Sequence, residues 1–415
     1  MTSAQRPILW DIYEEHLDEA AFLWGQWERA MVAANQTLDD VIAGPEERLL
    51  AHLDGLVLGG RRVAEKLLIP ALGDEDEGKV FAGTWALVQA EDADHLDLIV
   101  QRLPKAEPPA FAALARALEL STRRDLPARL GKLWETSDAR VQGALLDILA
   151  PRDPAWAGLR LESCLAASAP ALQAAALRAL RWRMDPAAGQ YVYQALGAQD
   201  GAVRQEAIAT GYAMRMPAVL DACRREAPTT EDSCRLPLAL LALGGVPADR
   251  QLVLSRLAVA EAQRHAIWAL GFLGDVETAD MLVAMLDDEA KARVAGESLS
   301  TITGLVIDGP MAQPGVTRGP GVEDVAPEDP VPEALPEDLL RMPAAAAVRK
   351  WLQGARGHFQ PGARYLCGAP WSEGALRAGL GKVATWRRGV LALEAVAKGR
   401  GSLVNVRSWG RGQRG

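Results

Sequence analysis

The chain has 415 residues and a formal net charge of −9, with 49 % hydrophobic and 24 % charged residues. A net negative charge does not favour general binding to nucleic acid, and this length favours a repeat array or several domains over one compact core. Ala and Leu are frequent while Phe, Tyr and Ile are few, so closely packed helices are favoured over sheets.

Charge is distributed unevenly along the chain. Residues 1–60 carry eleven acidic and three basic side chains, and residues 307–340 carry eight acidic and one basic. Residues 341–415 carry fourteen basic and two acidic side chains. The two ends are therefore expected either to attract each other or to present faces of opposite charge to partners.

The cysteines and the first residues bear on metals and location. Four cysteines are scattered without a CxxC pair, at Cys164, Cys223, Cys234 and Cys367. This pattern is typical of reduced core thiols and predicts no metal site or cofactor. The first residues lack a basic region followed by an apolar one, and no apolar run approaches the roughly 18 residues of a membrane helix. We expect a soluble cytoplasmic protein.

Residues 8–33 are predicted to form an amphipathic helix or helix pair. Apolar residues such as Trp10, Leu17 and Trp24 recur at helical spacing on one side. Acidic residues occupy much of the rest, namely Asp11, Glu14, Glu15, Asp18 and Glu19. One interpretation is a capping helix that covers the first repeat of an array. The other is an acidic face for a basic partner, which makes these five residues candidate partner-binding residues.

A further helix is predicted over 46–60, ending at a pair of glycines. It carries His52 and Asp54, a combination that suggests acid–base chemistry. Because His52 lies at helical spacing from two leucines, we favour a histidine that borders the apolar stripe and pairs locally.

One polar position recurs through the middle of the chain at intervals of 31, 31, 31, 29 and 29 residues. Its members are Gln142, Gln173, Arg204, Arg235, Arg264 and Arg293. Each lies near the start of a helical run rich in Ala and Leu, and a period of about thirty residues is typical of helical repeat arrays. We therefore predict an all-α fold, an α-solenoid of antiparallel helix pairs. An N-terminal helical cap covers 1–75, and the repeat array covers 76–306.

An acid often precedes the second helix of a pair, where it stabilises the helix N-terminus. The acids are Asp138, Asp200, Asp232, Glu261 and Glu289. The periodic arginine follows about four residues later and can reach the acid of its own or the adjacent repeat. The predicted structural ladder consists of Arg204, Arg235, Arg264, Arg293, Asp200 and Asp232. Since the period accounts for these residues, a catalytic role is the weaker interpretation, and no catalytic residue is predicted.

Residues 307–345 are rich in Pro, Gly and acids, which predicts a mobile linker or an acidic binding arm. Residues 346–415 are predicted to form a C-terminal helical segment, in which Ser372 caps a helix. Its basic tail places Arg407, Arg411 and Arg414 around Trp409. Arginine with tryptophan can contact a phosphate or a base, but docking of the tail against the array or its acidic start is favoured.

The residues Asp200, Val203, Arg204 and Ala207 resemble the pattern of HEAT and HEAT-like repeats. That resemblance implies a right-handed superhelix whose second helices line a concave surface for partner binding. HEAT-like modules also occur in phycobilin lyases, which is the enzyme alternative, but no residue set here specifies such an activity.

Three longer segments, over residues 9–24, 46–56 and 362–399, carry a more specific resemblance. They read LWDIYEEHLDEAAFLW, EERLLAHLDGL and GARYLCGAPWSEGALRAGLGKVATWRRGVLALEAVAKG. They resemble an uncharacterised proteobacterial HEAT-like family whose members are often encoded beside type VI secretion spike and effector genes. The resemblance implies a non-enzymatic interaction protein with another protein as its partner. An immunity protein that occludes a cognate toxin, such as a nuclease, is favoured, and the alternative is an adaptor that links an effector to the secretion spike.

Overall fold

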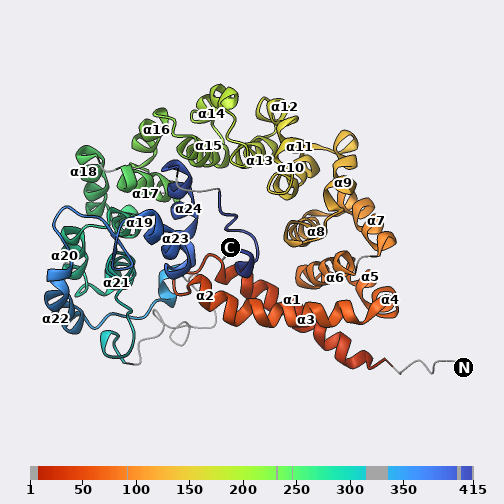
Figure 1. Ribbon diagram of the computed structural model, residues 1–415, viewed down its shortest axis with the longest axis horizontal. Helices are drawn as coiled ribbons and strands as arrows, with labels where there is room; N and C mark the ends of the chain where they lie inside the picture. The colour runs from red at the N-terminus through yellow and green to blue at the C-terminus, as the bar shows by residue number, and fades with distance from the viewer. Residues whose placement is uncertain are drawn as a thin grey trace, which may run out of the picture. The chain divides into compact units, whose positions relative to one another are not determined.

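The computed structural model describes residues 8–90, 92–229, 232–244, 246–314, 335–399 and 403–413. These residues are predominantly helical (Figure 1), which confirms the predicted all-α class. The chain divides into two compact units. Unit 1 consists of residues 1–31, 39–188 and 407–415, and unit 2 consists of residues 32–38 and 189–406.

In the described ranges, unit 1 contains six α-helices of eleven or more residues, together with a set of shorter ones. The long helices are α1 (Trp10–Ala30), α3 (Glu47–Leu58), α6 (Glu77–Gln89), α8 (Pro108–Leu120), α10 (Ala139–Leu149) and α13 (Pro170–Leu180). The shorter α-helices are α4 (Gly60–Val63), α5 (Ile69–Ala71), α7 (Ala93–Arg102), α9 (Leu126–Leu130), α11 (Pro154–Gly158) and α12 (Leu161–Leu165). Two π-helical turns, η1 (Ile42–Glu46) and η2 (Ala64–Leu68), and the 3₁₀ turns η3 (Leu103–Lys105), η4 (Gly131–Thr136), η5 (Pro186–Ala188) and η13 (Gly410–Gln413) complete it.

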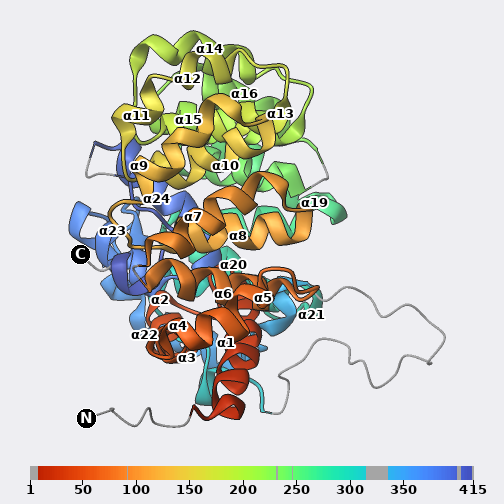
Figure 2. The ribbon, with the colours of Figure 1, turned by 90° about the vertical axis from the view of Figure 1, so that its right-hand side faces the viewer.

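The long helices of unit 1 contact one another in succession. Helix α1 contacts α3 and α6, and α6, α8, α10 and α13 each contact the next; α1 and α3 lie side by side in both views (Figure 2). Helix α6 approaches α1 so closely that a Cβ on Gly78 would lie 2.6 Å from the Ala21 carbonyl oxygen. A glycine is needed there because any side chain would collide with the α1 backbone.

Unit 2 repeats this plan with its own helices. Their bounds are α14 (Gly189–Ala195), α15 (Gly201–Ala213), α16 (Ala218–Glu226), α17 (Arg235–Gly244), α18 (Pro247–Ser255), α19 (Ala260–Leu273), α20 (Val276–Ala284), α21 (Glu289–Thr303), α22 (Ala345–Ala355), α23 (Glu373–Lys382) and α24 (Arg388–Ala397). The 3₁₀ turns are η6 (Asp232–Cys234), η7 (Arg256–Ala258), η8 (Gly309–Met311), η10 (Pro336–Leu339), η11 (Arg356–His358) and η12 (Thr385–Arg387). Helices α15, α17, α19 and α21 contact each other in turn, and α24 contacts α15 and α17. The short α2 (Leu38–Val41) begins in unit 2 and ends in unit 1.

Acidic N-caps explain where several helices begin. The Asp138 carboxylate accepts from the Val141 N–H at 2.9 Å, and the Asp200 carboxylate accepts from the Val203 N–H at 3.0 Å, as predicted. Helix α21 is capped by Asp288, with Glu289 as its first residue. Ser372 caps α23 by accepting from the Ala375 N–H at 3.1 Å, also as predicted.

A short hairpin in unit 2 was not predicted. Strands β1 (Tyr365–Leu366) and β2 (Ala369–Pro370) pair in antiparallel fashion around a turn in which Cys367 and Gly368 have φ values of 49° and 79°. The Cys367 N–H donates to the Thr301 carbonyl at 2.7 Å, so the hairpin closes the C-terminal end of α21. The turn was not predicted from the sequence because the apolar residues on both sides of 365–370 have helical spacing.

Of the predicted linker 307–345, residues 315–334 lie outside the described ranges. The flanking segments are hydrogen bonded to each other. The Gln313 N–H donates to the Met342 carbonyl and the Ala344 N–H donates to the Met311 carbonyl, both at 2.8 Å. None of the helices in the described ranges combines the length and the apolar composition needed to span a membrane.

Candidate functional site

A groove of about 520 Å³ runs over α8, α10 and α13 in unit 1. Its floor is made largely of the smallest side chains. They are Ala112 and Ala115 on α8, Gly143 and Ala144 on α10, and Ala171 and Ala175 on α13. Because these side chains are short, the surface of the three helices is recessed between the larger residues on either side.

Aromatic side chains lie at the α1 and α8 side of the groove. Trp24 stacks on Phe81 with the ring centroids 4.7 Å apart, so its orientation is fixed from behind. Phe111 is covered by the Arg140 guanidinium, whose central carbon lies 4.3 Å from the ring centroid. Arg140 is itself held by the Ala106 carbonyl at 2.8 Å. The aromatic rings on this side of the groove are therefore held in place by neighbouring side chains.

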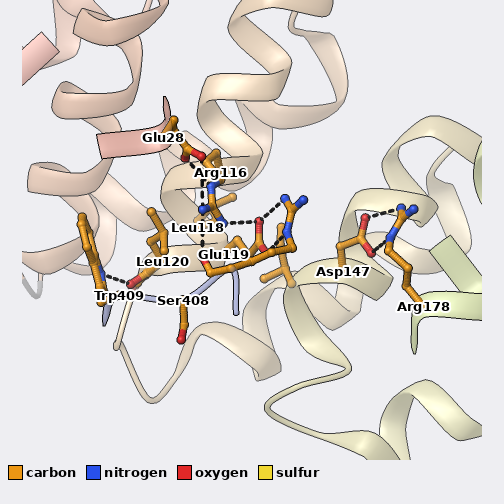
Figure 3. Close-up of polar contacts among 12 residues, drawn as sticks. Glu28, Arg116, Leu118, Glu119, Leu120, Asp147, Arg178, Ser408 and Trp409 are labelled. Carbon is orange, nitrogen blue, oxygen red and sulfur yellow. Dashed lines mark hydrogen bonds and ion pairs between the residues drawn. The ribbon is translucent and has the colours of Figure 1, made fainter. Parts of the chain in front are cut away.

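A row of alternating charges lines the groove. Figure 3 shows the polar contacts within this row. The Arg116 Nε donates to Glu28 Oε1 at 2.6 Å, and Arg116 Nη1 lies 2.8 Å from Glu119 Oε2 in an ion pair without hydrogen-bond geometry. Arg407 donates to both oxygens of Glu119, at 2.9 and 3.0 Å. A further pair lies next to these residues: Arg178 donates to both oxygens of Asp147, at 2.9 and 2.8 Å. Each arginine in the row therefore has a carboxylate partner.

The electrostatics of the row follow from this pairing. Burial alone would raise the pKa of Glu119, but the hydrogen bond from Arg407 and the charge of Arg116 lower it below its usual value. The bond to Glu119 raises the pKa of Arg407. Glu119 thus stays ionised and holds no proton to donate near neutral pH. The charges of the row are paired with one another, and the row does not resemble an acid–base pair.

The C-terminal tail is docked against the helices of unit 1, as predicted, and its Arg407 lines the groove. The Trp409 indole donates to the Leu120 carbonyl at 2.9 Å and lies 4.8 Å from the Trp27 ring. Two backbone N–H groups of the tail, at Gly410 and Arg411, donate to Glu46 at 2.6 and 2.8 Å. Arg414, the third predicted tail arginine, lies outside the described residues.

The predicted acidic face lies on α1. Asp11, Glu14, Glu15 and Asp18 are exposed and Glu19 is half-buried. Asp18 pairs with Lys79 at 2.8 Å. The exposed Phe22 and Ile12 lie on the same helix, so this surface is apolar as well as acidic. None of the five acids lines the groove.

The predicted ladder residues have different partners. Arg264 donates to Asp232 at 2.6 Å, one repeat away. Asp200 is an N-cap, and Arg204 donates to the carbonyls of Ala198 and Gln199 at 2.9 and 2.7 Å. The other two arginines have other contacts: Arg235 stacks between two tryptophans, and Arg293 donates to the Leu340 carbonyl.

His52 faces another histidine. Its Nδ1 lies 3.0 Å from Nδ1 of His16, so one of the two rings donates and the other accepts. Burial, followed by the nearby His16, lowers the pKa of His52. Between His52 and Asp54 no hydrogen bond or ion pair is seen in the described part of the chain, so this histidine pairs across two helices.

His265 in unit 2 gives a pH-dependent prediction. Burial lowers the pKa of His265 to about 4, although Asp232 lies 2.9 Å from its Nε2. The folded protein therefore binds fewer protons than the unfolded chain between pH 6.5 and 4, and stability is lost as pH falls through that window. The loss is on the order of 3 kcal/mol.

Urea unfolding at several pH values measures this loss. The free energy of unfolding of His265→Gln should depend less steeply on pH than that of the unmodified chain. The exposed His358→Gln is the control, and an unchanged profile for His265→Gln would contradict the assignment.

The groove residues were not singled out from the sequence. Asp147 and Arg178 are separated by 31 residues, which is the repeat period, so an alignment of the repeats would have paired them. Glu119 and Arg407 are separated by 288 residues and carry no such signal.

Comparison of the sequence with protein-family models and with curated proteins finds no match. Across the described ranges, no group of three or more His, Cys, Asp or Glu side chains is arranged to hold a metal ion.

Proposed function

We propose that this chain is a HEAT-like helical-repeat protein that binds another protein through the groove of unit 1. The thirty-residue period and the succession of contacts from α6 to α13 support the repeat assignment. In such an array every second helix lines one surface, and here α8, α10 and α13 line the groove.

The observation that carries the proposal is the combination of a floor of short side chains with a border whose charges are already paired. A site for a small molecule usually directs a few polar groups at its ligand. Here Arg116, Glu119 and Arg407 are directed at one another, and so are Asp147 and Arg178. An apolar ridge of a partner helix fits such a surface, with the paired charges fixing its position at the edge.

The proposed partner is a secreted effector, because of the resemblance to proteins encoded beside type VI secretion genes. On this proposal the chain is an immunity protein, and binding blocks the effector by occlusion. A specific interface of this kind buries roughly 1,600 Å² in total, of which the groove would form the central part.

Filling the groove is the test of this proposal. Ala144→Trp places an indole on the groove floor and is expected to reduce capture of the effector from co-expressing cells, and protection against it, at least tenfold. Ala51→Trp, at an exposed position of α3 outside the groove, is the matched control. Full protection by Ala144→Trp would refute the groove as the binding site. Export that depends on the chain, without protection, would favour the adaptor alternative over the immunity role.

The acidic face of α1 is proposed to steer a basic effector toward the chain. Raising the salt concentration from about 50 mM to about 500 mM is then expected to slow association at least tenfold, because screening weakens long-range attraction. Stopped-flow measurement with Asp11→Asn/Glu14→Gln/Glu15→Gln should show a shallower salt dependence. An association rate that is indifferent to salt would exclude steering by this face.

A further inference from the structure

A second concave site lies entirely in unit 2, in a pocket of about 380 Å³. One wall comes from Arg264, His265 and Trp268 on α19, another from Arg235 at the start of α17, and a third from Trp386 in η12. Residues Leu335, Pro336 and Glu337 cover it from η10 and the residue before it. None of these residues belongs to the groove of unit 1.

Arg235 is the unusual member of this pocket. Its guanidinium carbon lies 4.2 Å from the centroid of the Trp268 ring and 4.6 Å from that of Trp386. Its Nη2 is buried and has no hydrogen-bond partner among the described residues. A guanidinium stacked between two indoles keeps its charge while its N–H groups remain directed in the plane between the rings. Burying an N–H donor without a hydrogen bond costs free energy, and a hydrogen-bond acceptor in the pocket would offset this cost.

Trp268 is a second residue of this pocket with a buried N–H group that lacks a hydrogen-bond partner among the described residues. Its side chain is 3 % exposed, and its Nε1 is also buried without a hydrogen-bond partner in the described ranges. Two N–H donors on facing side chains of one pocket thus lack an acceptor. Buried donors in native proteins are nearly always satisfied, and exceptions point to an unfilled role.

The chain's own segment shows what kind of group approaches the pocket. The Glu337 side chain is 12 % exposed and its Oε1 lies 3.8 Å from Arg264 Nη1, which is too long for a hydrogen bond. Arg264 also donates to Asp232 at 2.6 Å. Glu337 therefore places a carboxylate beside Arg264 without satisfying the donors of Arg235 and Trp268.

From these contacts we infer that the pocket of unit 2 is a binding site for a short acidic, proline-containing peptide segment of a partner protein, and that residues 335–337 occupy it in the free chain. Pro336 lines the pocket together with the two tryptophans, and the arginines receive the carboxylate that follows the proline. A partner segment competes with residues 335–337 and must overcome their high local concentration, which for a tethered segment is in the millimolar range. This site is independent of the proposed groove function.

The test uses a fluorescein-labelled, C-terminally amidated peptide LPEDL, the sequence of residues 335–339, and fluorescence anisotropy with the full chain. Glu337→Ala weakens the internal competitor and is expected to bind the peptide at least tenfold more tightly than the unmodified chain does. Adding Arg235→Gln to Glu337→Ala should lower the affinity at least tenfold. The matched control is Arg356→Gln, at an arginine of unit 2 that pairs with Asp280 outside the pocket.

Urea unfolding checks that each variant folds, and Arg264→Gln replaces Arg235→Gln if the latter does not. The peptide LPQDL should bind at least fivefold more weakly than LPEDL. The inference is overturned by the absence of saturable binding to Glu337→Ala, by equal affinity for LPEDL and LPQDL, or by an effect of Arg356→Gln as large as that of the pocket variants. Because the groove is not involved, Ala144→Trp should bind the peptide as the unmodified chain does, which separates the two proposals.

Discussion

Replacing Glu297 by Gln is expected to lower the free energy of unfolding of unit 2 by about 3–5 kcal/mol, because it leaves a buried guanidinium without its counter-charge. Arg387 is fully buried and donates to the two carboxylate oxygens of Glu297 at 2.7 and 2.5 Å. The Trp386 indole donates to the same carboxylate at 3.1 Å. Two further N–H groups of Arg387 donate to the Trp268 carbonyl and the Ser298 hydroxyl, both at 2.8 Å.

The surrounding helix is shaped to accept this arginine. A Cβ on Gly271 would lie 2.7 Å from Arg387 Nη1, so α19 can approach the guanidinium only with a glycine there. Urea unfolding followed by tryptophan fluorescence measures the loss. Glu373→Gln, which removes an exposed carboxylate 3.6 Å from Arg377, is the control and should cost less than about 1 kcal/mol. A loss below about 1 kcal/mol for Glu297→Gln would show that the pair is not buried in solution.

The contrast between Arg264 and Arg387 shows what the sequence can predict. Arg264 and Asp232 are 32 residues apart, and the repeat period alone brings them to adjacent positions. Arg387 and Glu297 are 90 residues apart, and their pairing depends on how the C-terminal segment meets α19 and α21. The repeat period predicts a contact such as Arg264–Asp232, but it contains no information about a contact such as Arg387–Glu297.

The ladder illustrates a further limit. The period places Arg235 and Arg264 at equivalent positions, but Arg235 stacks between Trp268 and Trp386 whereas Arg264 donates to Asp232. Arg293 donates to the Leu340 carbonyl, which belongs to the segment that follows the predicted array. Equivalent positions thus acquire different partners wherever a segment from outside the array lies against them.

The groove was predictable only in part. The floor residues Ala112 and Gly143, and likewise Ala144 and Ala175, are separated by the 31-residue interval found in the sequence, and the docking of the basic tail was expected from its charge. Charge alone does not determine which acidic residues bind the tail, because the first sixty residues already contain eleven of them. The structure selects Glu46 and Glu119, which are held close to the tail by the buried Trp409.

Trp409→Ala is expected to destabilise unit 1 by about 3–5 kcal/mol, the range for removing a large aromatic side chain from a core. The Trp409 side chain is 7 % exposed, and its ring contacts Trp27 and Trp85, with centroids 4.8 and 6.3 Å away. Glu46 adds to the effect, because its carboxylate is 1 % exposed and needs the N–H groups that the tail brings to it.

Trp409→Phe separates the two contributions of this residue. It keeps an aromatic ring against Trp27 but removes the indole N–H that donates to the Leu120 carbonyl at 2.9 Å, so a loss of about 1–2 kcal/mol is expected. If the tail orients the groove, Trp409→Ala also releases Arg407 from Glu119 and weakens effector capture, whereas Trp409→Phe does not. Equal stability of Trp409→Ala and the unmodified chain in urea would mean that the tail is not docked in solution. The wall that Arg407 gives to the groove would then be absent as well, because both depend on the same tail being held in place.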